Sequence, residues 1–311
     1  MFFCAVMVRF LSAFLLLLSA TVASAGTFTT YEALEFASPG GEALLMDLRV
    51  PDGAGPYPVI VYLHSGAWIM GDRFGGPAVR QASRGYAVAS IEYRLAPDSI
   101  WPAQVEDTKA AIRWLRANAA RFRLDADRIG IFGTSAGGHI GSVAATSNGV
   151  PWLEGLALGN PQFPSGVKAV VDLYGPTDLL RIEEDKLPCI PLDGNSGWMP
   201  MSLLMGCPIQ QCQEWTRTAS PMSYVTPDDP PFLIMHGMLD CLVPFQQSIA
   251  LHDHLRAANV DSTLVLIPKG DHGGRVFDEP QYQAMVDAFL DEHLRGPVVV
   301  VQPVRRRAAG R

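Results

Sequence analysis

Short apolar runs separated by turn residues recur along this chain and are the first guide to its fold. Runs without polar alternation are typical of strands that are buried on both faces of a sheet. A "SPGGE" turn joins the first two runs. The pattern predicts eight strands, at residues 28–36, 44–50, 59–63, 87–93, 128–132, 167–173, 232–236 and 263–267.

Helical periodicity appears between these runs. In one segment four residues share one helical face: Val105, Thr108, Ile112 and Leu115. Three basic residues lie off that face: Lys109, Arg113 and Arg116. A last helix has its apolar residues at the same spacing: Tyr282, Met285, Val286, Phe289 and Leu290. Strands that alternate with helices predict one mostly parallel α/β sheet with helices on both faces. With no internal repeat or interdomain linker, we expect one domain over residues 26–295.

Residues 175–231 depart from this alternation. They are rich in proline, lack periodicity and include "SGWMPMSLLMG". We interpret them as a cap-like insertion that folds over one end of the sheet. Its Trp198 and Met201, together with Trp68, are candidates for an apolar substrate pocket, although a buried structural cluster explains these residues about as well.

Both ends of the chain differ from the middle. Residues 1–25 carry one positive charge, Arg9, then an apolar run and Ala23-Ser24-Ala25, which is the order of a secretory signal cleaved before Gly26. The alternative, a membrane anchor, needs about 20 apolar residues, and this run is shorter. We therefore expect a secreted or periplasmic protein without stable membrane insertion. Residues 296–311 are interpreted as a basic tail outside the fold.

The charge of the middle part excludes some partners. The net charge of the chain is −7, and removing Arg9 and the four arginines of the tail leaves −12 for residues 26–295. Such an acidic body argues against nucleic acids and anionic membranes as partners.

Four cysteines remain once Cys4 leaves with the signal. An even number in an exported chain predicts two disulfides, and three pairings are possible. The short spacing of Cys207 and Cys212 favours a local bridge, which leaves Cys189 to pair with Cys241. The alternative, a zinc site, lacks paired C-x-x-C spacing, and we expect no metal.

The stretch "RIGIFGTSAGGHIG" runs an apolar strand into one hydroxyl, Ser135, among small residues. Residues 133–137 fit G-x-S-x-G at a strand-to-helix turn, which exposes a nucleophilic serine at the carboxyl end of the sheet. A phosphate-binding loop is the alternative, but the lysine of a P-loop and the G-x-G-x-x-G spacing are missing. Ser135 is therefore the predicted nucleophile.

A serine hydroxyl needs a base, and one of the seven histidines stands out. His272 lies in the glycine-flanked loop "KGDHGG" after the last predicted strand, where its ring can reach the carboxyl end of the sheet. The others fit a strand end, a helix or the segment before the serine: His64, His139, His236, His252, His254 and His293.

An acid between Ser135 and His272 in chain order would complete the triad. Asp240 follows a buried strand in "PFLIMHGMLDCLVP" and would hold the His272 ring in the required tautomer. Asp178 is the alternative, but "YGPTDLL" fits a helix N-cap better.

Backbone N–H groups must also stabilise the oxyanion. The candidates are Ala136, directly after the serine, and Gly66 and Ala67 in "HSGAW".

The ordered motifs "HSGAWIMGD", "YRLAP", "GTSAGG", "HGMLDCLVP" and "DHGG" resemble the alpha/beta-hydrolase superfamily. Within it the chain resembles acetyl-esterase and hormone-sensitive-lipase-like carboxylesterases, above all secreted bacterial feruloyl- and acetyl-esterase-like (BD-FAE-like) domains. The resemblance covers residues 57–294 and implies the same triad and oxyanion hole. This chain has Ser65 and Ala67 where such families often carry glycine.

The expected function is that of a secreted serine carboxylesterase acting on small acyl or aryl esters, either small molecules or carbohydrate-linked, without a cofactor. One alternative is a serine peptidase of the prolyl-oligopeptidase type, which usually carries a separate propeller domain. Another is a non-catalytic binding protein on the same fold, which typically lacks a triad residue.

Overall fold

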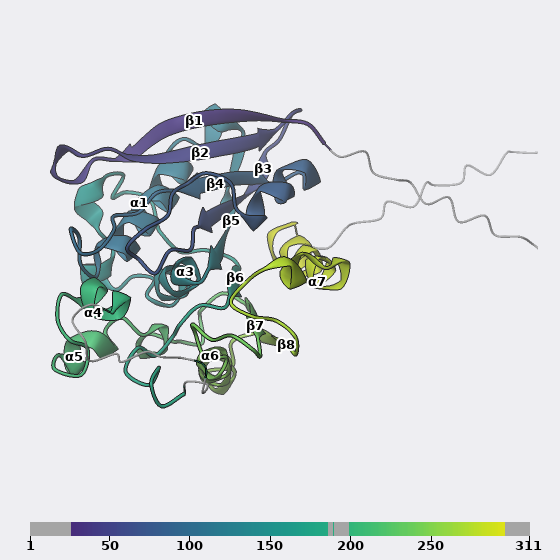
Figure 1. The fold of residues 1–311 in the computed structure, drawn as a ribbon. Coiled ribbons are helices and arrows are strands. Elements are labelled where there is room, and N and C mark those ends of the chain that lie inside the picture. The colour runs from purple at the N-terminus through teal and green to yellow at the C-terminus, as the bar shows by residue number, and fades with distance from the viewer. Residues whose placement is uncertain (1–25, 186–188, 190–198, 296–311) are drawn as a thin grey trace, which may run out of the picture.

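The computed structural model describes residues 26–185, 189 and 199–295, and an eight-stranded sheet forms its centre (Figure 1). The strand order is β1-β2-β4-β3-β5-β6-β7-β8. β2 pairs antiparallel with β1 and β4, and all the other pairs are parallel. The predicted eight-stranded, mostly parallel sheet is therefore confirmed. The strands are β1 (Phe28–Ala37), β2 (Leu44–Pro51), β3 (Tyr57–Leu63), β4 (Ala87–Ile91), β5 (Leu124–Thr134), β6 (Val170–Leu173), β7 (Phe232–Gly237) and β8 (Ser262–Ile267).

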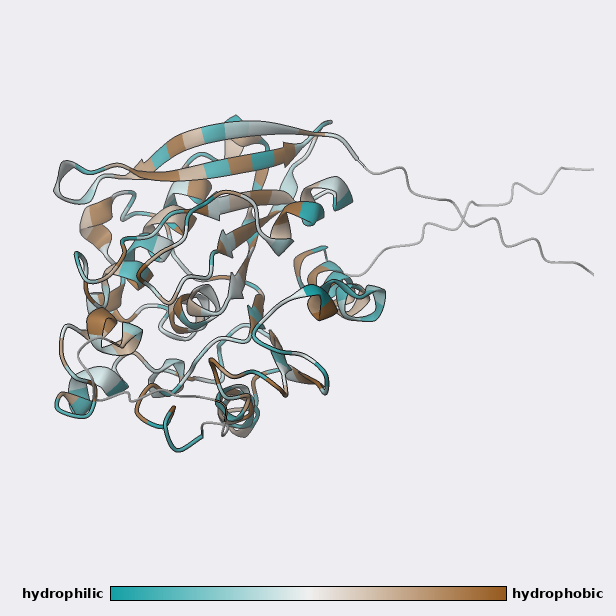
Figure 2. Cartoon of the chain, viewed as in Figure 1, coloured by the Kyte–Doolittle hydropathy of each residue, from teal (hydrophilic) through white to brown (hydrophobic). Residues whose placement is uncertain are grey.

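The strands β4, β5 and β6 begin or end at other residues than the apolar runs predict. β5 begins at Leu124, four residues before the predicted start, because Leu124 pairs with Tyr57 of β3 ahead of the apolar run. β4 ends at Ile91 and β6 begins at Val170, so residues 92–93 and 167–169 of the predicted strands belong to the adjoining loops. Figure 2 shows hydrophilic and hydrophobic residues alternating along β1 and β2, at one edge of the sheet.

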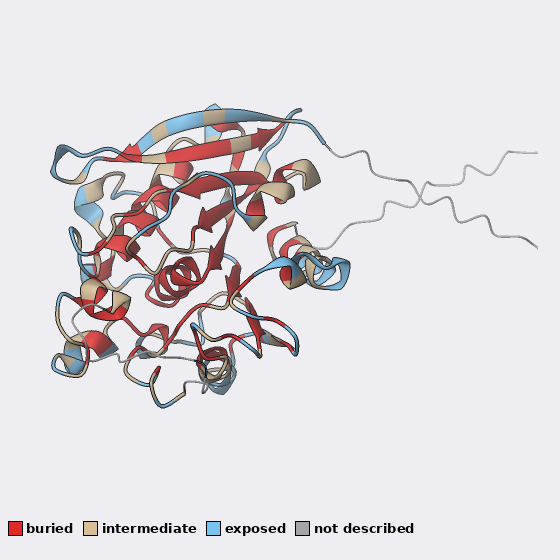
Figure 3. Ribbon diagram, in the orientation of Figure 1, coloured by how far each residue is buried: buried red, intermediate tan, exposed pale blue. Residues whose placement is uncertain are grey.

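Helices cover both faces of the sheet because alternate residues of each strand point to opposite sides. In β3, Val59 and Leu63 belong to the core beneath α1 and α3, whereas Ile60 and Tyr62 belong to the core beneath η2 and α7. β4, β6, β7 and α3 are buried throughout, while β1 has exposed positions (Figure 3). The helices are α1 (Ala103–Ala117), α2 (Ala119–Phe122), α3 (Ala136–Thr146), α4 (Pro200–Met205), α5 (Gln213–Arg217), α6 (Gln246–Ala257), α7 (Pro280–Leu290) and the 3-10 helix η2 (Pro77–Arg84).

Two basic residues of α1 are buried, although the periodicity places them off its apolar face. The Lys109 ammonium donates to the Ser147 carbonyl at 2.6 Å and to the Glu154 carboxylate at 2.8 Å. The Arg113 guanidinium donates to the backbone carbonyls of Glu154 and Gly155. The loop after α3 therefore covers this side of α1, and its carbonyls provide the partners that buried cations require.

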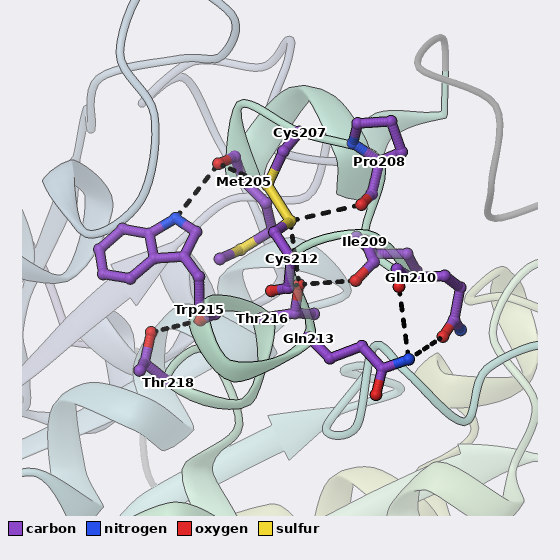
Figure 4. Close-up of a disulfide and its surroundings, with 10 residues drawn as sticks. All are labelled: Met205, Cys207, Pro208, Ile209, Gln210, Cys212, Gln213, Trp215, Thr216 and Thr218. Atoms are coloured by element: carbon purple, nitrogen blue, oxygen red, sulfur yellow. Dashed lines mark hydrogen bonds between the residues drawn. A yellow bond between two sulfur atoms is a disulfide. The ribbon is translucent and has the colours of Figure 1, made fainter.

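The segment 175–231 carries α4 and α5, which lie together beside the sheet (Figure 1). A disulfide between Cys207 and Cys212 closes the turn between these two helices (Figure 4). The Trp215 indole donates to the Met205 carbonyl across the same turn at 3.2 Å. These contacts give a short segment with little periodicity a defined shape.

The second disulfide joins Cys189 to Cys241, so both pairs are those favoured from the sequence. The predicted signal segment 1–25, the tail 296–311 and Trp198 lie outside the described residues. Within the described part of the chain, no helix has the length and apolar character needed to cross a bilayer.

Candidate active site

Ser135 stands at the sharp turn between β5 and α3. Its backbone has φ 53° and ψ −119°, a strained conformation for a residue with a side chain. The turn brings the backbone very close to β3, since a Cβ atom on Gly137 would lie 2.2 Å from the Leu63 carbonyl oxygen. Only glycine fits there, which explains the small residues around the serine.

The structure brings Ser135, His272 and Asp240 together from three loops at one edge of the sheet. The Ser135 hydroxyl lies 2.8 Å from His272 Nε2, and His272 Nδ1 lies 2.7 Å from the Asp240 carboxylate. A carboxylate only accepts hydrogen bonds, so Nδ1 carries the proton and Nε2 has a free lone pair directed at the hydroxyl. The His272 side chain is 16% exposed and Asp240 is fully buried.

Asp240 is held by hydrogen bonds on both carboxylate oxygens. One oxygen accepts the N–H groups of Leu242 and Val243, each at 2.8 Å. The other accepts from His272 and from His236 Nε2, which lies at 3.1 Å. Burial by itself would raise the pKa of Asp240, but the bonds from His236 and His272 hold this pKa well below its ordinary value. Asp240 is therefore a carboxylate at neutral pH.

Asp178 does not contact this group. No helix begins at Asp178, contrary to the N-cap interpretation; its carboxylate accepts the N–H of Leu180 at 3.1 Å inside a turn. Gln247 of α6 accepts the backbone N–H of Asp178 through its side-chain oxygen. Asp178 thus shapes the loop after β6.

His139 supports the site from beneath the loop that follows β3. Its Nε2 donates to the Ala219 carbonyl at 2.7 Å, and its Nδ1 accepts the Trp68 indole N–H at 3.1 Å. Burial lowers the pKa of His139 to about 4, so the ring is neutral and can accept from the indole. Trp68, a candidate pocket residue, is therefore also fixed to the helix that carries Ser135.

Tyr174, directly after β6, is a site residue that the sequence does not reveal. Its ring packs edge-on against His272 with a centroid distance of 4.8 Å. It has φ 47°, rare for a residue of this size. The contact limits the positions that the imidazole can occupy.

Ala67 and Ala136, two of the predicted oxyanion-hole residues, line a cavity together with Ser135, and the third, Gly66, directly precedes Ala67. Within residues 26–185 and 199–295, none of the three donates to a protein acceptor. Gly66 has φ 130°, and a Cβ atom there would lie 1.9 Å from the Met70 carbonyl oxygen. The tight turn after β3 therefore requires glycine at this position. Ala136 opens α3, and its N–H belongs to the first turn, which favours negative charge.

A cavity of about 140 Å³ opens beside Ser135 and His272. Trp68 and Met201 line it, as the sequence suggests. Most other lining residues are apolar and come from the segment 175–231 and the Asp240 loop: Pro176, Ile182, Met199, Pro200, Leu242 and Val243. Among the described residues, no cluster of three or more histidine, cysteine, aspartate or glutamate side chains could hold a metal ion.

The strand order, the elbow serine and the facing histidine and carboxylate define an α/β-hydrolase fold with the layout of a serine hydrolase site. The BD-FAE family model matches residues 46–255, and the chain belongs to this family.

Relatives and solved structures agree with this membership. The chain is 35% identical to esterase LipC of Mycobacterium tuberculosis over 72% of its own length and 54% of the relative's. It is 32% identical to the probable carboxylic ester hydrolase LipM of the same organism, over 66% of this chain and 46% of LipM. A truncated carbohydrate esterase from gut microbiota aligns with a TM-score of 0.73 at 31% identity, covering 86% of this chain and 97% of that structure. The chain spans about half the length of the curated relatives it matches.

Proposed function

We propose that this protein is an exported serine esterase that hydrolyses carboxylic esters of small acyl or aryl acids. The observation that carries the proposal is the 2.8 Å contact of the Ser135 hydroxyl with a His272 ring nitrogen whose partner nitrogen faces a buried carboxylate. The backbone N–H groups of Gly66, Ala67 and Ala136, which have no acceptor among the described residues, and the esterase relatives support the same reaction.

Ester cleavage proceeds in two stages at this geometry. The Ser135 oxygen attacks the ester carbonyl carbon while His272 Nε2 takes its proton. The carbonyl oxygen becomes an oxyanion that accepts the N–H groups of Gly66, Ala67 and Ala136, each worth about 3–4 kcal/mol in the transition state. His272 then protonates the leaving alkoxide, which departs as the alcohol and leaves an acyl-serine.

Water completes the cycle. His272 removes a proton from a water molecule, whose oxygen attacks the acyl carbon, and a second tetrahedral intermediate forms. Its collapse returns the proton to Ser135 and releases the carboxylic acid. Asp240 stabilises the imidazolium that forms in each stage and stays ionised throughout, in keeping with its lowered pKa.

The cavity supports a preference for short acyl groups. A space of about 140 Å³ accepts an acetyl or butyryl chain more readily than an octanoyl chain. Solved neighbours described as a carbohydrate esterase and a bifunctional GH43-CE protein of Bacteroides eggerthii support carbohydrate-linked esters as candidate natural substrates. Two disulfides and the signal-like residues 1–25 support export with cleavage before Gly26.

The test is hydrolysis of p-nitrophenyl acetate, butyrate and octanoate by the protein, Ser135→Ala and Ser147→Ala. Ser147 is a buried serine at the end of the same helix, and its hydroxyl donates to the Val143 carbonyl. Activity should fall by about 10⁴-fold or more in Ser135→Ala and stay within about twofold in Ser147→Ala. Equal inactivity of all three proteins would reject the esterase, and faster cleavage of a p-nitroanilide would favour a peptidase. A rate that peaks with octanoate would reject the short-acyl preference.

A further inference from the structure

Ser65 occupies a place between the two parts of the proposed oxyanion hole. It directly precedes Gly66 and Ala67, which supply two of the N–H groups. Thr134 directly precedes Ser135 and Ala136, which supply the nucleophile and the third N–H group. The relative position of these two backbone segments therefore sets the geometry of the hole.

A side-chain hydrogen bond joins the two segments at this point. The Ser65 hydroxyl donates to Thr134 Oγ1 at 2.7 Å and lies 3.2 Å from the Thr134 carbonyl oxygen. Thr134 is 1% exposed, so water cannot replace the contact freely. Such a bond is short and shielded, and it acts directly beside the N–H groups that must converge on one oxygen atom.

Two tyrosines extend the contact on either side. The Tyr62 hydroxyl lies 3.2 Å from Thr134 Oγ1. Burial raises the pKa of Tyr174 to about 12, and the nearby Ser65 side chain opposes this rise. Tyr174 also packs edge-on against His272, the proposed base.

We propose that Ser65 and Thr134 are positioning residues that hold the Gly66–Ala67 backbone at the correct distance from Ala136. The proposal rests on the esterase function above and adds a role for side chains that touch neither the substrate nor the reacting atoms. Glycine at position 65 would leave this link unmade, so the serine gives the loop a restraint of its own.

The first measurement is the split between kcat and KM for p-nitrophenyl acetate in Ser65→Ala. Removing one oxyanion donor costs roughly 10²–10³-fold in kcat elsewhere, so displacing donors that remain present should cost less. We expect kcat to fall about tenfold with KM nearly unchanged, because the donors act mainly in the transition state. The inhibition constant of phenylboronic acid, which forms a tetrahedral adduct with a serine, should rise by a similar factor.

Position 134 provides an independent pair of variants. Thr134→Val removes the acceptor at almost constant volume and should reproduce the loss, whereas Thr134→Ser keeps the hydroxyl and should restore kcat to within about twofold. The double variant Ser65→Ala/Thr134→Val should be no worse than either single variant, since both remove one interaction. This pair also carries the test if Ser65→Ala does not fold.

Thr146→Val is the matched control. Thr146 is a buried threonine of α3 whose hydroxyl donates to backbone carbonyls, including that of Pro221 at 3.1 Å. Its loss should lower stability without lowering kcat. If Ser65→Ala and Thr134→Val retain full kcat, or if Thr146→Val loses as much as they do, the positioning role is wrong. If the unaltered protein hydrolyses no ester, the proposed function fails instead.

Discussion

His139 is expected to make the free energy of unfolding depend on pH, and substitution of this one residue can test the effect. The ring is fully buried and accepts the Trp68 indole N–H on Nδ1, while Nε2 donates to the Ala219 carbonyl. Protonation would place a second N–H against that indole, leaving a buried donor without an acceptor. This is why burial holds the pKa near 4, compared with 6.5 for an ordinary histidine.

The free energy of unfolding falls as the pH is lowered, because the unfolded state binds the proton first. The unfolded chain takes up the proton near pH 6.5 and the folded chain only near pH 4, so the unfolded state gains stability as the pH falls between these values. The contribution of a neutral His139 is thus fully present above about pH 7. It is lost progressively as the pH falls towards 4. A difference of about 2.5 pH units corresponds to about 3 kcal/mol.

The assay is urea unfolding of the protein and of His139→Asn at several values between about pH 7 and pH 4. The variant should be less stable at pH 7, because the Ala219 carbonyl loses its partner and a cavity opens. The difference in unfolding free energy should shrink by about 3 kcal/mol by pH 4, since only the histidine protein loses stability through this group. Taking the difference removes the effects of other titrating groups, such as Asp172, whose pKa burial raises to about 6.

Thr146→Val is the control for this measurement, because it removes a buried hydroxyl and no titrating group. Its difference from the unaltered protein should stay constant over the same range. A constant difference for His139→Asn as well would show that the ring does not titrate abnormally, and the reasoning would be refuted.

Two further predictions concern the proposed catalytic acid and the disulfides. Asp240→Asn should lower kcat by about 10⁴-fold because the amide no longer selects the Nδ1–H tautomer of His272, whereas Asp178→Asn should leave kcat within about twofold; steady-state kinetics on p-nitrophenyl acetate compare them. Loss of Cys189–Cys241, which spans 52 residues, should reduce the free energy of unfolding by about 4 kcal/mol, against about 2 kcal/mol for Cys207–Cys212, which spans five. Double serine variants in urea test this order, and a larger loss from the shorter loop would contradict it.

The sheet could be predicted from the sequence because its parallel strands contain short apolar runs, as in β3 and β7, which are buried on both faces. The elbow could be predicted because Gly137 and its neighbours leave room for a backbone approach that no larger residue allows. The burial of Lys109 could not be predicted, since its partners lie in a loop 38 and 45 residues further along the chain. Local periodicity gives no information on contacts between residues so far apart in the sequence.

The same limit applies to the site. Chain order and loop chemistry predict Ser135, Asp240 and His272, and the side chains of these three residues lie in hydrogen-bond contact. Tyr174 and the pocket residues of the Asp240 loop give no local signal, because their role arises only when β6, β7 and β8 end side by side. His236 is similar: it looks like an ordinary strand residue until its ring is seen to face the Asp240 carboxylate.

The segment 175–231 is anchored to α3 and to the loop before α1, through His139 with Ala219 and the Trp101 N–H with the Leu204 carbonyl. Its Leu204 and Ala219 are buried in the main core. The proposed chemistry, in contrast, comes from loops attached directly to the strands. For protein engineering, the residues of the segment that face the cavity can therefore be varied apart from the residues that anchor it. Libraries confined to Ile182 and Met199 would reshape the cavity wall, while the reacting groups and the anchoring contacts keep their places.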